Sequence, residues 1–162
     1  MENHILVHHD VMLLNDLKQY ILLYSVDYLL VYRRPTIFIY GEGWAAQAPV
    51  IPGEQCAMKA NAYKMPGVAV FSDDLRDGLK GHFSQATGRG FATGAEDCEE
   101  SVKFGIVGAT AHPQIDFTKC NNSKFGYANH PVQVVNYVSC HDDLCLTDKL
   151  AKSMPGSTEE ER

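Results

Sequence analysis

Residues 66–81 read Pro66-Gly67-Val68-Ala69-Val70-Phe71-Ser72-Asp73-Asp74-Leu75-Arg76-Asp77-Gly78-Leu79-Lys80-Gly81. Residues 68–71 predict a buried strand, because a short β-branched and aromatic run follows a Pro-Gly turn. A helix is expected to follow, capped by Asp73 or Asp74 and ended by Gly81. A strand that leads directly into a helix is the unit from which parallel sheets are built.

The same alternation continues on both sides of this stretch. Residues 36–40 and 132–138 are two further apolar runs and predict two more strands. Residues 82–131 are rich in Gly, Asn, Ser and Thr and predict loops with one helix near 98–107. Another helix is expected with Leu146 and Leu150 on one face. The predicted fold class is therefore α/β, with three parallel strands in the order 36–40, 68–71, 132–138.

The two ends of the chain differ from this pattern. Residues 11–32 predict a helix with an apolar stretch interrupted by Asp27. The segment lacks the basic start of a signal peptide and the uninterrupted apolar run of a membrane span. Residues 153–162 form a polar tail. We expect residues 35–152 to be the folded unit.

The composition argues against a nucleic-acid partner, and the length of the chain limits the number of domains. The chain has 162 residues and a net charge of −6, with its basic residues scattered along the sequence. Nucleic-acid binding needs a concentrated basic face, so no nucleic acid partner is predicted. The length suits one domain with a core.

The five cysteines are irregularly spaced and odd in number. This pattern does not indicate a disulfide framework and favours reduced, buried thiols, which are typical of the cytoplasm. Cys140, His141 and Cys145 form an alternative metal-binding pattern. No Cys-x-x-Cys pair supports it, and we predict no metal site.

Two carboxylates follow predicted strands. Glu42 comes after residues 36–40, and Asp142 comes after residues 132–138. Glycosidic hydrolysis requires one protonated carboxyl group and one carboxylate near the anomeric carbon. Trp44, beside Glu42, offers a face on which a sugar ring can stack. The alternatives are a solvated surface charge for Glu42, a helix cap for Asp142 and a core aromatic for Trp44.

A dinucleotide-binding loop is a further alternative for Gly41-Glu42-Gly43-Trp44-Ala45-Ala46. That motif must open a helix at once, whereas Pro49 and Pro52 follow here. No acidic residue ends a second strand about 20 residues later. We therefore favour the glycosidase interpretation.

Three ordered blocks resemble type I pullulanases, which are debranching members of the α-amylase superfamily. The blocks are residues 40–44, residues 61–81 and residues 136–142. The resemblance implies a partial (β/α)8 barrel, covering about strands five to seven of a catalytic domain.

The resemblance also implies the role of each candidate residue. Glu42 corresponds to the general acid/base, Asp142 to the residue that stabilises the transition state, and His141 to a substrate-binding histidine. Trp44 belongs to the same substrate-binding group. The family has asparagine where Asp143 stands. No Gly-Phe-Arg-Phe-Asp block, which carries the family's nucleophile, precedes Glu42.

The expected function is that of a piece of a retaining hydrolase of α-1,6 branch linkages, inactive alone, from a truncated or frame-shifted gene. Residues 1–34 look foreign to the family. The expected partner is an α-glucan, with no membrane and no organic cofactor. Calcium occurs in some relatives, but no ligand cluster is evident here. The alternative is a non-catalytic remnant that binds glucan weakly and self-associates through open sheet edges.

Overall fold

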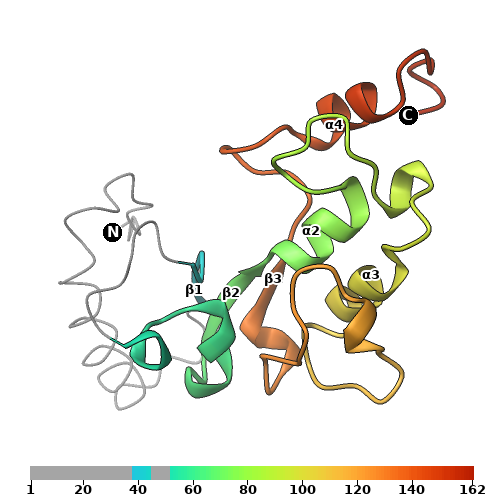
Figure 1. Cartoon of the computed structure of the whole chain (residues 1–162). Helices are drawn as coiled ribbons and strands as arrows, with labels where there is room; N and C mark the ends of the chain where they lie inside the picture. The colour runs from blue at the N-terminus through green and yellow to red at the C-terminus, as the bar shows by residue number, and fades with distance from the viewer. Residues whose placement is uncertain (1–37, 45–51) are drawn as a thin grey trace, which may run out of the picture.

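The computed structural model describes residues 38–44 and 52–162 (Figure 1). The helix expected over residues 11–32 lies outside the described residues. So do residues 36–37 of the first predicted strand and residues 45–51, where the dinucleotide-binding alternative would place its helix.

The three predicted strands form one parallel sheet. β1 spans Ile39–Gly41, β2 spans Val68–Ser72 and β3 spans Val134–Asn136. The sheet order is β1-β2-β3, and Tyr40 pairs with Ala69 while Phe71 pairs with Val135. The predicted order and the parallel orientation are confirmed.

The third strand is shorter than predicted at both ends. The expected range was 132–138, but Pro131–Gln133 forms the 3-10 helix η5, and the strand stops at Asn136. Gln133 explains the late start. Its buried side chain donates to the carbonyl oxygens of Ala62 at 2.6 Å and Met65 at 3.1 Å. These bonds turn residues 131–133 away from the ladder.

Helix α2 follows β2 directly and spans Asp73–Lys80. Its cap is Ser72, whose hydroxyl oxygen accepts from the Leu75 N–H, so the predicted cap at Asp73 or Asp74 is wrong. Both aspartates instead lie in the first turn, where negative charge is favourable. Gly81 ends the helix with a φ of 90°, as a glycine can at little cost.

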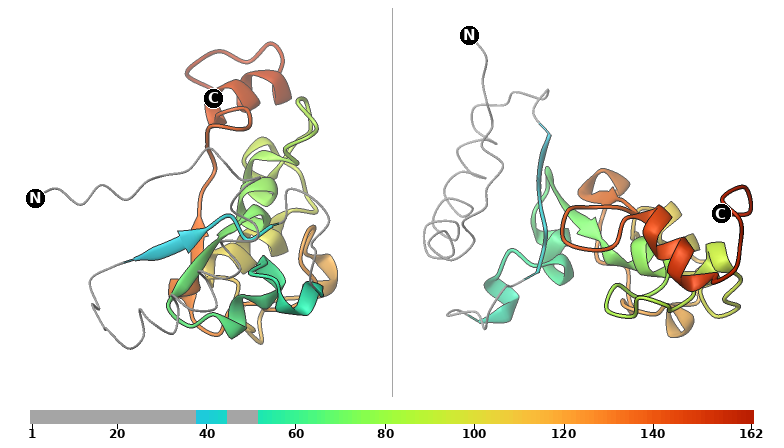
Figure 2. Two further views of the ribbon diagram at one scale, coloured as in Figure 1. Left: turned by 90° about the vertical axis from the view of Figure 1, so that its left-hand side faces the viewer. Right: turned by 90° about the horizontal axis from the view of Figure 1, so that it is seen from above.

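Two more helices complete the unit. α3 spans Glu99–Ile106 and α4 spans Leu146–Ser153, so both predicted helices are confirmed, and α4 runs one residue into the predicted tail. Short 3-10 helices interrupt the loops: η1 Gly53–Gln55, η2 Lys59–Lys64, η3 Phe91–Thr93 and η4 Phe117–Lys119. In the right-hand view of Figure 2, α2, α3 and α4 all lie on one side of β1.

The two faces of the sheet have different neighbours. Val70 packs in the core with Phe104 of α3 and with Tyr127, and the rings of Phe104 and Tyr127 lie 5.6 Å apart. Asn136 faces the same way and donates to the Gly105 carbonyl oxygen at 2.8 Å. Side chains alternate along a strand, so Tyr40, Phe71 and their neighbours lie on the other face.

The prediction of buried cysteines is wrong at two positions. Cys56, Cys98 and Cys120 are buried, whereas Cys140 is half-buried and Cys145 is exposed. The two exceptions lie in the irregular segment between β3 and α4, and none of the residues of the core cluster comes from it. Among the described residues, no helix combines the length and the apolar character needed to cross a membrane.

Candidate active site

Both predicted catalytic residues follow strands of the sheet in the sequence. Glu42 directly follows β1, and Asp142 lies in the segment that follows β3. Because the three strands are parallel, the segments that follow them all leave the sheet at the same edge. Glu42, His141 and Asp142 are all exposed to solvent.

An aromatic row crosses the sheet beside this edge. The Phe71 ring of β2 lies 5.7 Å from Tyr40 of β1 and 5.1 Å from Tyr137 after β3. The Trp44 ring lies 6.4 Å from Phe71. Phe71 therefore connects the segment of Glu42 and Trp44 with the segment that leads to His141 and Asp142.

Trp44 is half-buried and packs on the Phe71 ring. The alternative of a core aromatic therefore holds for the buried part of its side chain. Its remaining surface is open to solvent. A half-exposed indole held by a second ring can both support the sheet and offer a stacking face.

Arg76 of α2 holds the other end of the row. Its guanidinium donates to the Tyr137 hydroxyl at 2.6 Å and to the Asp77 carboxylate at 2.7 Å. Burial raises the pKa of Tyr137 to about 12, against the opposing effect of Arg76, and the charge of Asp142 adds to the rise.

Asp142 does not cap the helix that follows it. The N-cap position of α4 is Cys145, which makes no side-chain cap bond, and the Leu146 N–H donates to the Ser139 hydroxyl at 2.8 Å. Asp142 instead accepts from the Cys140 thiol at 2.6 Å. Its carboxylate stays at the surface, available to a ligand.

Asp143, where the resembled family has asparagine, forms an ion pair with Lys80 of α2. The Lys80 Nζ lies 2.9 Å from Asp143 Oδ2, and both side chains are buried. Partial burial opposes ionisation, but the nearby ammonium of Lys80, the Leu144 N–H and the charge of Arg76 lower the pKa of Asp143. Asp143 therefore faces inward, away from the exposed Asp142.

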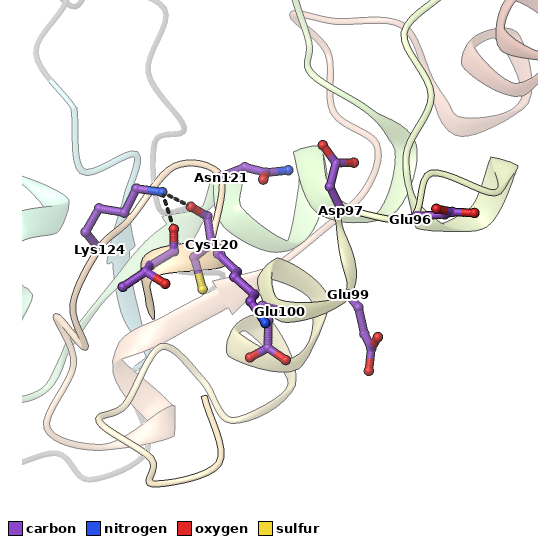
Figure 3. Close-up of a pocket in the computed structure, with 9 residues that line it drawn as sticks. Glu96, Asp97, Glu99, Glu100, Cys120, Asn121 and Lys124 are labelled. Atoms are coloured by element: carbon purple, nitrogen blue, oxygen red, sulfur yellow. Dashed lines mark hydrogen bonds between the residues drawn. The ribbon is translucent and has the colours of Figure 1, made fainter. Parts of the chain in front are cut away.

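A polar pocket of about 530 Å³ lies at the start of α3 (Figure 3). Lys124 reaches across it to the carbonyl oxygens of Thr118 and Cys120. None of the predicted site residues lines this pocket. Within residues 38–44 and 52–162, no group of three or more His, Cys, Asp and Glu side chains is arranged to hold a metal ion. The pocket thus contains neither of the predicted catalytic carboxylates.

Sequence reasoning missed three residues of this edge. Phe71, Tyr137 and Arg76 were not singled out, although the alternation along β2 puts Phe71 on the face opposite Val70. Arg76 and Tyr137 are far apart in sequence and meet only because α2 ends beside the segment after β3.

The similar proteins of known identity, both curated sequences and solved structures, are pullulanases. No protein-family model matches the chain. Pullulanase of Bacillus subtilis (strain 168) is 34% identical over 122 residues, which cover 75% of this chain and 16% of that protein. Pullulanase A of Streptococcus pneumoniae is 27% identical over 125 residues, which cover 74% of this chain and 8% of that protein. The resemblance inferred from the three sequence blocks is confirmed.

Solved pullulanase structures match as well. The pullulanase of Paenibacillus barengoltzii in complex with maltohexaose and α-cyclodextrin is 34% identical, with a TM-score of 0.67 over 93% of this chain and 21% of that one. Type I pullulanase of Bacillus subtilis in complex with maltose is 31% identical, with a TM-score of 0.72 over 85% of this chain and 18% of that one. The chain thus spans about a fifth of these two solved proteins and 16% of the curated Bacillus subtilis pullulanase.

Proposed function

We propose that this chain is a section of a pullulanase-type catalytic barrel, covering about strands five to seven, and that it contributes the acid/base Glu42 and the transition-state stabiliser Asp142. The observation that supports the proposal is the packing of Trp44 and Tyr137 on the same Phe71 ring. This packing links the two segments that bear the carboxylates.

Glu42 would protonate the oxygen of the leaving sugar and then deprotonate the attacking water. Its place after β1, at the carboxyl edge of a parallel sheet, is where barrel enzymes carry such groups. Trp44 would stack on a sugar ring beside it. The substrate class would be an α-glucan with α-1,6 linkages.

Asp142 and His141 would hold sugar hydroxyls and stabilise the positive charge that develops at the anomeric carbon. Both are exposed, in the segment that follows β3. Two matched pullulanases were solved with maltose or maltohexaose, which fits a glucan as the ligand.

The nucleophile would come from outside these 162 residues, because the sequence contains no Gly-Phe-Arg-Phe-Asp block. Retaining hydrolysis passes through a covalent glycosyl-enzyme, which needs that carboxylate. The isolated chain would therefore bind glucan weakly and release no reducing sugar from pullulan.

The chain carries its own probe for this proposal, since Trp44 is its single tryptophan. We expect maltohexaose to change the Trp44 fluorescence, with a dissociation constant on the order of 1 mM. Asp142→Asn should weaken the binding at least about fivefold, because a charged hydrogen-bond acceptor is lost. Asp148→Asn is the matched control, an exposed aspartate of α4 that should leave the affinity unchanged.

If the Trp44 fluorescence did not change up to ~50 mM maltohexaose, about 50-fold above the expected dissociation constant, the glucan-binding proposal would be overturned. An equal response in wild type and Asp142→Asn would remove Asp142 from the site. Hydrolysis of pullulan by the isolated chain would show that the nucleophile lies within it.

A further inference from the structure

The Lys80–Asp143 pair is buried more deeply than a surface ion pair. The Lys80 side chain is 0% exposed and the Asp143 side chain 7%. Lysine is almost never fully buried unless its charge is matched. Lys80 Nζ also donates to the Leu144 carbonyl oxygen at 2.7 Å, so this ammonium has two partners in the segment after β3.

The pair joins two parts of the candidate site. Lys80 is the last residue of α2, the helix that follows β2. Asp143 directly follows Asp142, and its Oδ1 accepts from the Leu144 N–H at 2.6 Å. Arg76, one turn earlier on α2, donates to the Tyr137 hydroxyl. α2 therefore holds residues 137–144 at both ends.

We propose that Lys80 and Asp143 form a positioning pair that fixes residues 139–144, and with them Asp142, at the carboxyl edge of the sheet. The part that concerns Asp142 and glucan rests on the proposed function. The fixing of the segment does not depend on it. Asp143 touches no substrate in this proposal and acts through the position of its neighbour.

The charge of Asp143 is the essential property. An asparagine at position 143 has a similar shape but leaves Lys80 as a buried cation without a counter-charge, and removal of one partner of a buried pair is strongly destabilising. Lys80 would then have to turn toward water, which would release its contacts with Asp143 and Leu144. The segment that carries Asp142 would open more often.

Cys140 reports on this opening. It is half-buried, lies within the segment and donates to Asp142. In a Cys145→Ser background, which removes the exposed thiol, the rate of alkylation by uncharged N-ethylmaleimide can be followed by peptide mass spectrometry. We expect Asp143→Asn and Lys80→Met each to raise the rate at Cys140 at least about fivefold, because local opening controls access.

Comparing the two variants separates the effect of segment opening on the alkylation rate from the effect of charge on the ionisation of the Cys140 thiol. Loss of a negative charge near a thiol promotes its ionisation, and loss of a positive charge suppresses it. A faster reaction in both variants therefore reports a loosened segment. Asp148→Asn, an exposed aspartate of the adjoining α4, is the matched control and should leave the rate unchanged.

Cys98 and Cys120 test whether the effect is local. Both are buried in the part of the chain around α3, and we expect their slow alkylation to stay as in the parent. Equal acceleration at Cys98, Cys120 and Cys140 would show that the pair supports the whole unit, which would overturn the positioning role. Unchanged alkylation of Cys140 in either variant would overturn it as well.

The maltohexaose titration provides the second readout. Asp143→Asn should weaken the Trp44 response as Asp142→Asn does. A normal affinity in Asp143→Asn, with weakened binding in Asp142→Asn, would overturn the claim that the pair positions Asp142. If wild type itself does not bind maltohexaose, the proposed function fails, and the alkylation rates alone decide whether the pair fixes the segment.

Discussion

Buried charge at the level of single residues organises the helix that leads away from β2. Asp74 is fully buried, and its carboxylate accepts from the Ser123 N–H and the Ser123 hydroxyl, both at 2.7 Å. Lys59 provides the counter-charge, with its Nζ 3.1 Å from Asp74 Oδ2. The first turn of α2 is thereby tied to a loop far along the chain.

Asp74→Ala should lower the free energy of unfolding by about 3 kcal/mol, because it leaves the Ser123 N–H without its acceptor and deprives Lys59 of one counter-charge. Urea denaturation measures the change. Asp148→Ala, at an exposed position of α4, should stay within about 0.5 kcal/mol of wild type. A loss below about 1 kcal/mol at Asp74 would contradict this account of its role.

Single residues are also where the sequence was least informative. Glu42, His141, Asp142 and Trp44 stand in recognisable blocks and could be singled out. Lys80 and Asp143 could not be paired from sequence, because the contact joins residues on separate elements and depends on how α2 meets the segment after β3. The cap at Ser72 was missed because Asp73 and Asp74 are equally good capping residues by type.

At the level of elements, the contact between α2 and α3 depends on glycine. A Cβ at Gly105 of α3 would lie 2.5 Å from the Leu75 Cβ, and one at Gly78 of α2 would lie 2.7 Å from the Ser101 Cβ. These two positions let the helices approach closely while Val70 and Phe104 pack between the sheet and α3.

Gly105→Ala should therefore destabilise the chain by about 1–3 kcal/mol, although alanine is the better helix former by about 1 kcal/mol. The added methyl group must push α3 away from Leu75. Thermal or urea unfolding measures whether the substitution raises or lowers the free energy of unfolding. Thr147→Ala, an exposed change on α4, serves as the control for propensity alone. If Gly105→Ala were more stable than wild type, moving α3 away from α2 would cost no free energy, which would contradict this account of the contact.

Elements were the level at which the sequence predicted most. The apolar runs gave the three strands and their order. Helix α2 was predicted with its end at Gly81 but with the wrong cap, and α4 from Leu146 and Leu150 on one face. The helix near 98–107 was expected without a clear periodic signal. The third strand was predicted too long because the run beginning at Val132 is apolar and β-branched. Its start is set by the hydrogen bonds of Gln133 to distant carbonyl groups, which no local pattern reveals.

At the level of the whole molecule, β1 and β3 are the two edges of the described sheet. Phe38 and Tyr40 at β1 are 57% and 52% exposed. Open edges and exposed aromatic side chains favour pairing with a second copy. We predict concentration-dependent self-association, seen as a mass above 18.0 kDa in sedimentation experiments. Tyr40→Lys should reduce it, and a monomer at every concentration would refute the prediction.

The central claim is that Glu42 is the acid/base of a pullulanase-type site, and the most direct measurement restores the rest of the barrel. Residues 38–152 would replace the matching section of the Paenibacillus barengoltzii pullulanase, and hydrolysis of pullulan by the chimera would be measured. We predict activity that falls about 10²–10⁴-fold in Glu42→Gln, because a general acid is lost. Glu54→Gln, at an exposed position of η1, should leave it unchanged. A folded chimera without activity, or one whose activity survives Glu42→Gln, would contradict the claim.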